Sequence, residues 1–398
     1  MKRKKLLIIF FSSLILLTGC WNRRELNELS IVVGLGIDQE NGQYLITAQV
    51  VNPSEIASKK GGSGKTPVVV YQSKGETLFE AVRKITTVAP RKLYFAHLRI
   101  LIFGEEVAKK GIGDIIDALL RDSEVRNDFY ITVTKNSSAA DVLKVLTPLE
   151  KIPANSLFAS LEVSAKSWSP TEGVTLVQLV SNMVSDGINP ILTGVEILGK
   201  VSEGETTKNV EQTQPKAILQ YKGLAIFKQD KLIGWMNERD SRAVHFALGK
   251  VKSSVGNVIC PDGGKAVIEV VDTKAKINTK MSKGEPRGSI KLKVQGNVAE
   301  IECKGLDLTN PASISYLEKE SEKNLTQIIN TTIQHAQNNF RSDIFGFGEA
   351  LFRSEPNDWK KYKKNWDQTF SKMPVTVEVD MEIRQTGTIN NSPINKVE

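Results

Sequence analysis

The chain has 398 residues, of which 40% are hydrophobic and 25% charged, and this composition excludes collagen-like, low-complexity and largely disordered chains. The formal net charge is +8, but four of the positive charges fall within residues 2–5. Lys and Arg balance Asp and Glu at 20 each over residues 20–200, and number 29 against 25 over residues 201–398. That excess is too small and too dispersed for a nucleic-acid-binding surface, so we expect no nucleic-acid partner.

The first segment has the organisation of an export signal. Basic residues occupy positions 2–5, and an apolar run, LLIIFFSSLILL, follows over 6–17. A membrane-spanning helix needs about 20 apolar residues, whereas this run has the length of a signal-peptide core. Leu17-Thr18-Gly19-Cys20 then matches the spacing of a bacterial lipobox. We expect a lipoprotein signal peptide over 1–19 and lipidation of Cys20, on its thiol by diacylglyceryl and on its amino group by an acyl chain. An ordinary secretory leader is the alternative.

The segment after the leader begins with strand patterns. Residues 30–37 and 44–51 flank the turn 40–42 and predict a hairpin, and a polar, Gly-rich loop follows over 52–67. Apolar spacing then predicts helices over 76–88 and 108–120, and strands over 93–103 and 128–134. Further helices are expected at 138–146 and 172–184, on either side of a Pro- and Ser-rich stretch, 147–170.

Residues 201–215 are polar and without periodicity, and they predict a linker. They would separate an N-terminal α+β region over 20–200, of one or two subdomains, from a C-terminal α+β domain over 216–390. In the latter we expect a hairpin, 217–227 with 231–236, then strands at 251–259, 265–278 and 288–302, a long helix at 311–340, a shorter helix at 356–371 and a strand at 375–384. Asn310 and Pro311 supply the start of the long helix. Strands and helices are segregated, which favours α+β with mixed or antiparallel sheets flanked by helices.

No motif points to catalysis or to a cofactor. Residues 61–66 (GGSGKT) resemble the end of a phosphate-binding loop, but Lys59 stands where its first glycine belongs. The three histidines lie in no metal-binding frame, and no nucleophile motif is present. We therefore expect no enzyme activity, no cofactor and no metal.

Two smaller features leave alternatives open. Trp359, Tyr362 and Trp366 share one helix face that continues to Phe370, surrounded by lysines. The aromatic rings could rest on lipid headgroups, but we favour their packing into the core. Cys260 and Cys303 could form a disulfide or remain two buried thiols.

The chain resembles the Ger(x)C family, and short segments in order carry the resemblance. The first is Cys20-Trp21-Asn22-Arg23-Arg24-Glu25-Leu26, in which the family usually has Asp at the position of Asn22. The others are 33–38 (VGLGID), 96–99 (AHLR), 121–126 (RDSEVR), 223–227 (GLAIF), 231–235 (KLIGW), 343–349 (DIFGFGE) and 384–387 (RQTG).

The resemblance implies the C subunit of a nutrient germinant receptor in bacterial spores. Such a subunit is non-enzymatic, is lipid-anchored to the outer face of the spore inner membrane, and assembles with membrane subunits A and B. It would have three α+β domains. Whether it binds a small molecule directly stays open.

The resemblance also draws attention to two charged segments. We expect a structural or subunit-contact role for Arg121, Asp122, Glu124 and Arg126, and for Asp343, Gly346, Gly348 and Glu349. Charged turns of this kind often form salt-bridge networks that orient domains, and the two glycines permit a tight backbone path.

The alternative is a lipid-anchored solute-binding protein of an uptake system. Such a protein shares the leader but is built as two βαβ lobes with a ligand cleft between them. The regular alternation of strands and helices that this requires is absent from the sequence pattern.

Overall fold

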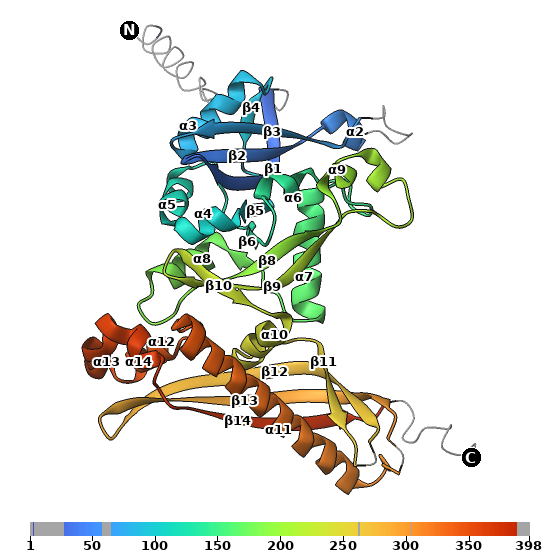
Figure 1. Ribbon diagram of the computed structural model, residues 1–398, viewed down its shortest axis with the longest axis vertical. Coiled ribbons are helices and arrows are strands. Elements are labelled where there is room, and N and C mark those ends of the chain that lie inside the picture. Colours follow the sequence, from blue (N-terminus) through green and yellow to red (C-terminus); the bar gives the residue numbers. More distant parts are fainter. Residues whose placement is uncertain (1–2, 4–27, 58–64, 262, 304, 388–398) are drawn as a thin grey trace.

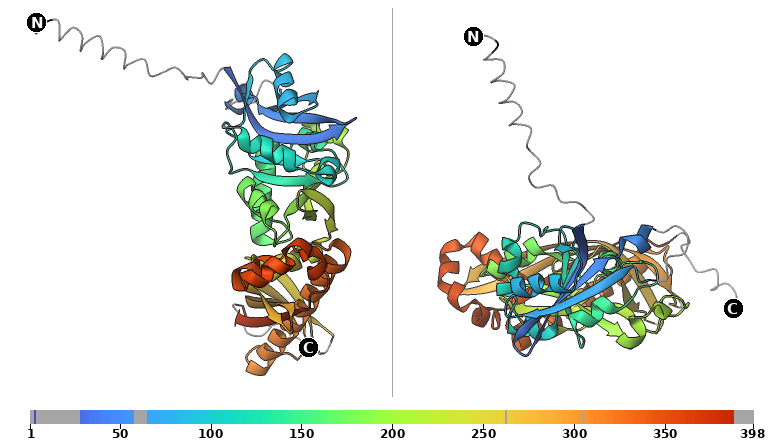
Figure 2. Two further views of the ribbon diagram at one scale, coloured as in Figure 1. Left: turned by 90° about the vertical axis from the view of Figure 1, so that its left-hand side faces the viewer. Right: turned by 90° about the horizontal axis from the view of Figure 1, so that it is seen from above.

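The computed structural model describes residues 3, 28–57, 65–261, 263–303 and 305–387. Cys20 and all of the predicted signal peptide except residue 3 lie outside the described residues, as do Lys59 and most of the segment 61–66. The described strands form one sheet of ten and one of four, and the two parts lie one above the other along the long axis of the molecule (Figures 1 and 2). The predicted α+β, multi-domain architecture with mixed sheets is confirmed.

The predicted hairpin at the start of the chain is confirmed. It consists of β1 (Leu29–Glu40) and β2 (Gln43–Val51), which pair antiparallel. Asn41 and Gly42 connect them with φ of 50° and 84°, the left-handed conformation that tight hairpin turns require. β3 (Val68–Gly75) adds to β2 and ends the sheet, and the short helix α2 (Pro53–Ala57) follows β2.

The centre of the large sheet is parallel. β1, β5 (Ile100–Phe103), β6 (Tyr130–Thr134) and β8 (Ile191–Leu198) run in the same direction, as buried β-branched strands with helical crossovers do. The short strands β4 (Lys92–Tyr94) and β7 (Val174–Thr175) pair with β1 and β6. The helices of this part are α3 (Leu78–Lys84), continued by the 3₁₀ turn Ile85–Thr87, α4 (Glu105–Lys110), α5 (Gly113–Arg121), α6 (Ala139–Lys144), α7 (Pro153–Ser167) and α8 (Leu176–Val184).

Three sequence expectations in this part need correction. The strand predicted over 93–103 is interrupted, because residues 95–99 form a turn between β4 and β5. The helix predicted over 108–120 is two helices, which separate at Gly111 with φ of 130°. The stretch 147–170 contains the 15-residue helix α7, which begins at Pro153 and buries Leu157 and Leu161.

The segment 201–215 is not the free linker that its polarity predicts. It contains α9 (Val201–Gly204) and a 3₁₀ turn (Thr207–Asn209), and Asn209 is buried. The Asn209 amide donates to the carbonyls of Leu146 and Ala217 at 3.0 and 2.9 Å. Moreover, β9 (Ile218–Lys228) pairs with β8, and β10 (Lys231–Met236) pairs with β9, so the large sheet continues across the segment. The polar composition of 201–215 does not reveal this packing, because the buried hydrogen bonds of Asn209 hold the segment in place.

The C-terminal part is a four-stranded sheet with helices. Its order is β11 (Ser254–Ile259), β12 (Lys265–Ser282), β13 (Glu285–Ile301) and β14 (Val375–Gln385), and the last pair is parallel. The long predicted helix is α11 (Pro311–His335), capped by the Asn310 side chain and followed by a π-helical turn, Ala336–Phe340. A disulfide joins Cys260 to Cys303 with 5.8 Å between their Cα atoms.

Four further helices complete this part: α10 (Glu238–Ala247), α12 (Phe347–Ser354), α13 (Pro356–Tyr362) and α14 (Trp366–Phe370). The single helix predicted over 356–371 is divided by a 3₁₀ turn, Lys363–Asn365. Trp359, Trp366 and Phe370 are buried, which confirms that this aromatic face packs into the core.

The two parts share a hydrophobic core. Residues of β8, β9 and β10 (Ile191, Leu224, Ile226 and Met236) belong to the same buried cluster as Ile290 and Leu292 of the small sheet and Ile329 and Ile333 of α11. Within the described residues, no helix is both long and apolar enough to cross a bilayer.

Candidate functional site

The charged turn at the end of α5 is on the surface. Arg121 Nε lies 2.7 Å from Asp117 Oδ2, and Arg126 Nη2 lies 2.9 Å from Asp128 Oδ2. The Asp122 carboxylate accepts the backbone N–H of Glu124 at 2.9 Å. Glu124 in turn pairs with Lys92 of β4 at 2.8 Å. The two arginine pairs are local and exposed, and pairs of this kind contribute little to stability, whereas the Glu124–Lys92 pair joins the turn to β4.

The second predicted segment, 343–349, is at the start of α12, and its central group is a buried carboxylate. Asp343 is fully buried. Its Oδ1 accepts the backbone N–H groups of Phe345 and Gly346 at 3.1 and 2.9 Å. Its Oδ2 accepts the backbone N–H of Gly348 at 2.8 Å and the indole N–H of Trp366 at 2.9 Å. One side chain therefore fixes the first turn of α12 and ties it to α14.

Burial also changes the titration of Asp343. Removal from water raises the pKa of its carboxyl to about 6, and the N–H donors limit the rise because they stabilise the ionised form.

Two glycines allow the close contact around Asp343. Gly346 has φ of 82°, a conformation that side-chain-bearing residues rarely adopt. A Cβ on Gly348 would lie 2.6 Å from the Cα of Gly187 and 2.7 Å from the indole nitrogen of Trp366. Gly187 belongs to the loop between α8 and β8, so this contact crosses between the two parts of the molecule.

Further hydrogen bonds join the 343–349 segment to the same loop. The Asp343 carbonyl accepts from the backbone N–H of Asn189 at 2.7 Å, and the Glu349 N–H donates to the Gly187 carbonyl at 3.2 Å. Ser185 Oγ donates to the Glu349 carboxylate at 2.9 Å. The segment that the sequence singles out is therefore one side of an interdomain contact, and 185–189 is its other side. Nothing in the sequence pattern identifies that partner.

Ion pairs flank this contact. Lys228 at the end of β9 lies 2.7 Å from Asp367 of α14, and Lys363 pairs with Asp186. Ser342 Oγ donates to the Phe227 carbonyl at 2.8 Å.

A second interdomain contact, which the sequence analysis missed, lies where α7 ends. The indole N–H of Trp168 donates to Glu238 of α10 at 2.7 Å, and the Ser169 hydroxyl donates to the Ser253 carbonyl at 3.0 Å. His245 of α10 is buried; its Nδ1 lies 2.6 Å from the Ser169 carbonyl, and its Nε2 lies 3.5 Å from Glu172 Oε2.

Glu172 has a strongly perturbed titration. Burial alone would raise the pKa of this carboxyl, but the His245 ring and the Lys250 ammonium outweigh burial and lower the pKa to about 2.

The two groups of residues that the sequence singled out lie in different places. The turn 121–126 is at the surface of the larger part, while the segment 343–349 contributes to the junction between the two parts. Among the described residues, no cluster of His, Cys, Asp and Glu could hold a metal ion.

Two mixed sheets, helices on their faces and a buried, hydrogen-bonded junction between them define a multi-domain α+β protein. Residues 22–197 match the family described as "Spore germination protein N-terminal domain", and residues 222–387 match "Spore germination B3/ GerAC like, C-terminal". The chain belongs to this family of spore germination proteins, the Ger(x)C family.

Individual relatives match over almost the whole chain. The chain is 31% identical to spore germination protein KC of Bacillus subtilis (strain 168), covering 98% of both chains. It is 24% identical to spore germination protein B3 of the same organism, covering 98% of this chain and 100% of the relative. A crystal structure of the GerBC protein has the same fold, with a TM-score of 0.56, 20% identity, and coverage of 88% of this chain and 96% of the other.

The close approach of Gly348 to Gly187 can be tested by Gly348→Ala. The new Cβ would overlap backbone and indole atoms that cannot move freely, so we expect the free energy of unfolding to fall by about 1–3 kcal/mol. Urea denaturation measures the change. The matched control is Gly256→Ala in β11, whose Cβ meets no atom within 4 Å and should stay within about 0.5 kcal/mol of wild type. Equal stability of the two variants would contradict the tight contact.

The charge of Glu172 predicts a pH dependence of stability. Because its pKa is lowered in the folded chain, its contribution is present above the unfolded value of about 4.5 and is lost as pH falls towards 2. We expect wild type to lose about 3 kcal/mol more than Glu172→Gln between pH 5 and pH 2, measured by denaturation at each pH. Glu150→Gln, at an exposed position, should follow wild type. Parallel profiles for Glu172→Gln and wild type would exclude the effect.

Proposed function

We propose that this chain is a non-enzymatic, lipid-anchored C subunit of a nutrient germinant receptor and is required for nutrient-triggered spore germination. The observation that carries the proposal is the end-to-end match to spore germination protein KC, which leaves no large segment of either chain unmatched. The match to a GerBC structure supports the same assignment through the fold alone.

The anchor in this proposal is Cys20. Two or three acyl chains, each contributing about 0.8 kcal/mol per buried methylene, hold a protein stably where one chain does not. β1 begins at Leu29, nine residues after Cys20. Because an extended chain spans at most about 3.5 Å per residue, the β1 end of the large sheet would lie within about 30 Å of the lipid surface. The proposed location is the outer face of the spore inner membrane, as the resemblance to the Ger(x)C family implies.

The proposed partners are the A and B membrane subunits of the receptor. The two predicted groups would then have different roles. Asp343, Gly346, Gly348 and Glu349 make contacts inside the molecule, which supports a structural role. Arg121, Asp122, Glu124 and Arg126 lie at the surface with mostly local ion pairs, which favours contact with another subunit.

The proposed function is tested by spore germination in a strain that carries Cys20→Ala at the native locus, beside wild type and a full deletion. We expect both mutants to respond less to nutrient mixtures and normally to a trigger that bypasses receptors. The loss in Cys20→Ala has a physical cause, since the chain would no longer be held at the membrane. Germination of single spores, followed by loss of refractility, is the measurement.

The other outcomes separate the parts of the proposal. If only the deletion fails, the receptor role stands and the lipid is dispensable. If the deletion germinates normally on every nutrient mixture, even with related receptor genes removed, the receptor role is wrong. Nutrient uptake that is lost in the same strain would then favour the solute-binding alternative.

The subunit-contact role of the turn 121–126 is tested by the double reversal Arg121→Glu with Arg126→Glu. Loss of two exposed ion pairs should change the stability of the purified chain by less than about 1 kcal/mol. We nevertheless expect a lower level of the A subunit in spores and slower germination, measured by immunoblot and germination assay. Lys166→Glu, on the exposed face of α7, is the control and should have neither effect. Normal germination and A-subunit level in the double variant would exclude the role.

A further inference from the structure

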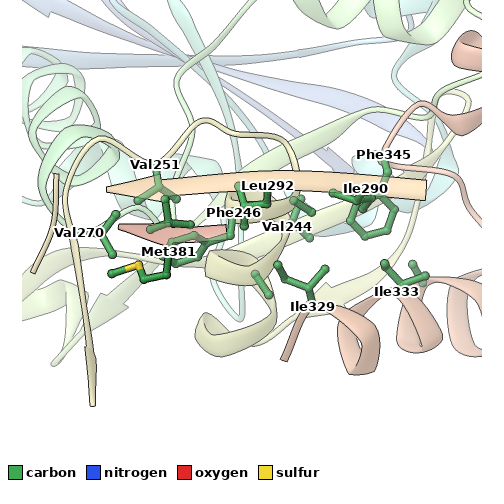
Figure 3. Close-up of a cluster of buried hydrophobic side chains, with 14 of the residues drawn as sticks. Val244, Phe246, Val251, Val270, Ile290, Leu292, Ile329, Ile333, Phe345 and Met381 are labelled. Carbon is green, nitrogen blue, oxygen red and sulfur yellow. The ribbon is translucent and has the colours of Figure 1, made fainter. Parts of the chain in front are cut away.

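The four-stranded sheet of the C-terminal part has a covered face and an open face. α10 and α11 pack on the covered face, where Ile290 and Leu292 of β13 share a buried cluster with side chains of both helices (Figure 3). Successive side chains of a strand point to opposite faces, so Lys291 and Lys293 lie on the open face. Both lysines are exposed.

Cations form two rows on the open face, one on β12 and one on β13. Residues 272–293 contain seven Lys and Arg but only two Asp and Glu. Three cross-strand pairs join residues of the same charge: Lys274 with Lys293, Lys276 with Lys291, and Lys280 with Arg287. All six side chains are exposed, and together we call them the basic face. Because like charges directly opposite each other destabilise a sheet, the stability of the fold does not account for this pattern.

Only part of this positive charge is neutralised within the molecule. Lys291 lies 2.8 Å from Glu378 of β14, and Lys293 lies 3.8 Å from Asp380. On β12, the nearest acid to Lys274 along the strand is already paired with Lys252. The cations of the basic face that form no ion pair with any described residue include Lys276, Lys280 and Arg287.

A row of acids borders the basic face and limits what can bind there. The register of β13 with β14 places Glu378, Asp380 and Glu382 on the same side of the sheet as the lysines. The open face is therefore positive over β12 and β13 and negative over β14. A layer of anionic lipid headgroups or a nucleic-acid backbone is negative throughout and would meet the acids as well. A protein can place its carboxylates over the basic face alone.

The open face is also distant from the proposed anchor. The four-stranded sheet lies at the opposite end of the long axis from β4 and the start of β1 (Figures 1 and 2). β1 begins nine residues after Cys20, so the proposed anchor holds that end of the molecule near the lipid. In this respect, the choice of a protein over a lipid surface rests on the proposed function.

We propose that the basic face binds an acidic segment of another protein. Carboxylates of the segment would lie over Lys276, Lys280 and Arg287 and would relieve the repulsion between the paired cations. An extended segment suits the face, because its alternate side chains are about 7 Å apart, the same spacing as that of alternate residues on β12.

The probe is octaglutamate with an N-terminal fluorescein, titrated with the purified full chain and followed by fluorescence anisotropy in about 0.1 M NaCl. A glycine–serine octapeptide with the same label is the neutral probe. We expect octaglutamate to bind at least about tenfold more tightly than the neutral peptide. Its affinity should fall as the NaCl concentration rises, because salt screens exposed charges.

The double variant Lys276→Glu with Lys280→Glu places the binding on the basic face. It should weaken octaglutamate at least about tenfold, because two attractive charges become repulsive. Each new carboxylate lies opposite a cation of β13, Lys291 or Arg287, so the melting temperature of the variant should not fall. Loss of binding without loss of stability separates a binding role from a structural one.

Two further variants are matched to this one. Lys166→Glu with Lys200→Glu makes the same change in net charge at exposed positions outside the four-stranded sheet. It should change the affinity for octaglutamate by less than about twofold, because charges beyond a Debye length are screened. Glu378→Gln with Asp380→Asn removes the acids beside the basic face and should strengthen binding.

Three results would overturn the proposal. One is octaglutamate that binds no more tightly than the neutral peptide. Another is equal weakening by the basic-face variant and the Lys166–Lys200 control, which would show an effect of net charge alone. The third is no binding of octaglutamate but binding to vesicles of equal parts phosphatidylcholine and phosphatidylglycerol that the basic-face variant loses, which would make a lipid surface the occupant. None of these measurements involves germination, so the proposed receptor role would stand in each case.

Discussion

One buried carboxylate, that of Asp343, fixes the segment of the C-terminal part that contacts the large sheet's loop 185–189. Asp343 has no access to water, so its charge must be compensated inside the protein, and four N–H groups do so. Three of these donors are at the start of α12, and the fourth is the indole of Trp366. The carbonyl of the same residue holds the loop before β8 through Asn189. A change in any of these neighbours would leave a buried charge or a buried donor without its partner, which makes the whole junction cooperative.

The second contact stabilises the same junction by different means. It combines the stack of the Arg242 guanidinium on the Trp168 ring with the buried imidazole of His245 beside the Glu172 carboxylate. The junction therefore has two separate attachments, one at each end of the β8–β10 region, and an apolar core between them. Two attachments restrict rotation about the connection as well as separation.

Local chemistry explains which elements could be predicted from the sequence. The hairpin at Asn41-Gly42 and the start of α11 at Asn310-Pro311 depend on residues adjacent in the chain, and both were predicted correctly. α7 was missed because serines and prolines conceal its apolar face, although Pro153 stands at its first position. α10 was missed because its first turns are charged and its buried residues face two different elements.

Long-range pairing explains the remaining differences. The order of strands in the large sheet brings β1 between β2 and β5 and joins β8 to β6, and no pattern within a single strand specifies such neighbours. The same holds for the candidate site. Resemblance singled out 343–349, but its contact with 185–189 arises only when α12 packs against the loop before β8.

The continuity of the large sheet bears on how members of this family can exchange segments. The N-terminal family region ends at residue 197, inside β8, and the C-terminal family region begins at residue 222, inside β9. These two strands pair with each other. A chimera joined between them would combine strands from two relatives within one ladder, where every side chain packs against a neighbour from the other parent. A crossover after β10, at residue 237, would instead keep all strands of the large sheet from one parent. The two parental sequences would then have to pack against each other only at the junction between the two parts. The large sheet is therefore the segment to exchange as a whole, and its boundary lies after the β9–β10 hairpin.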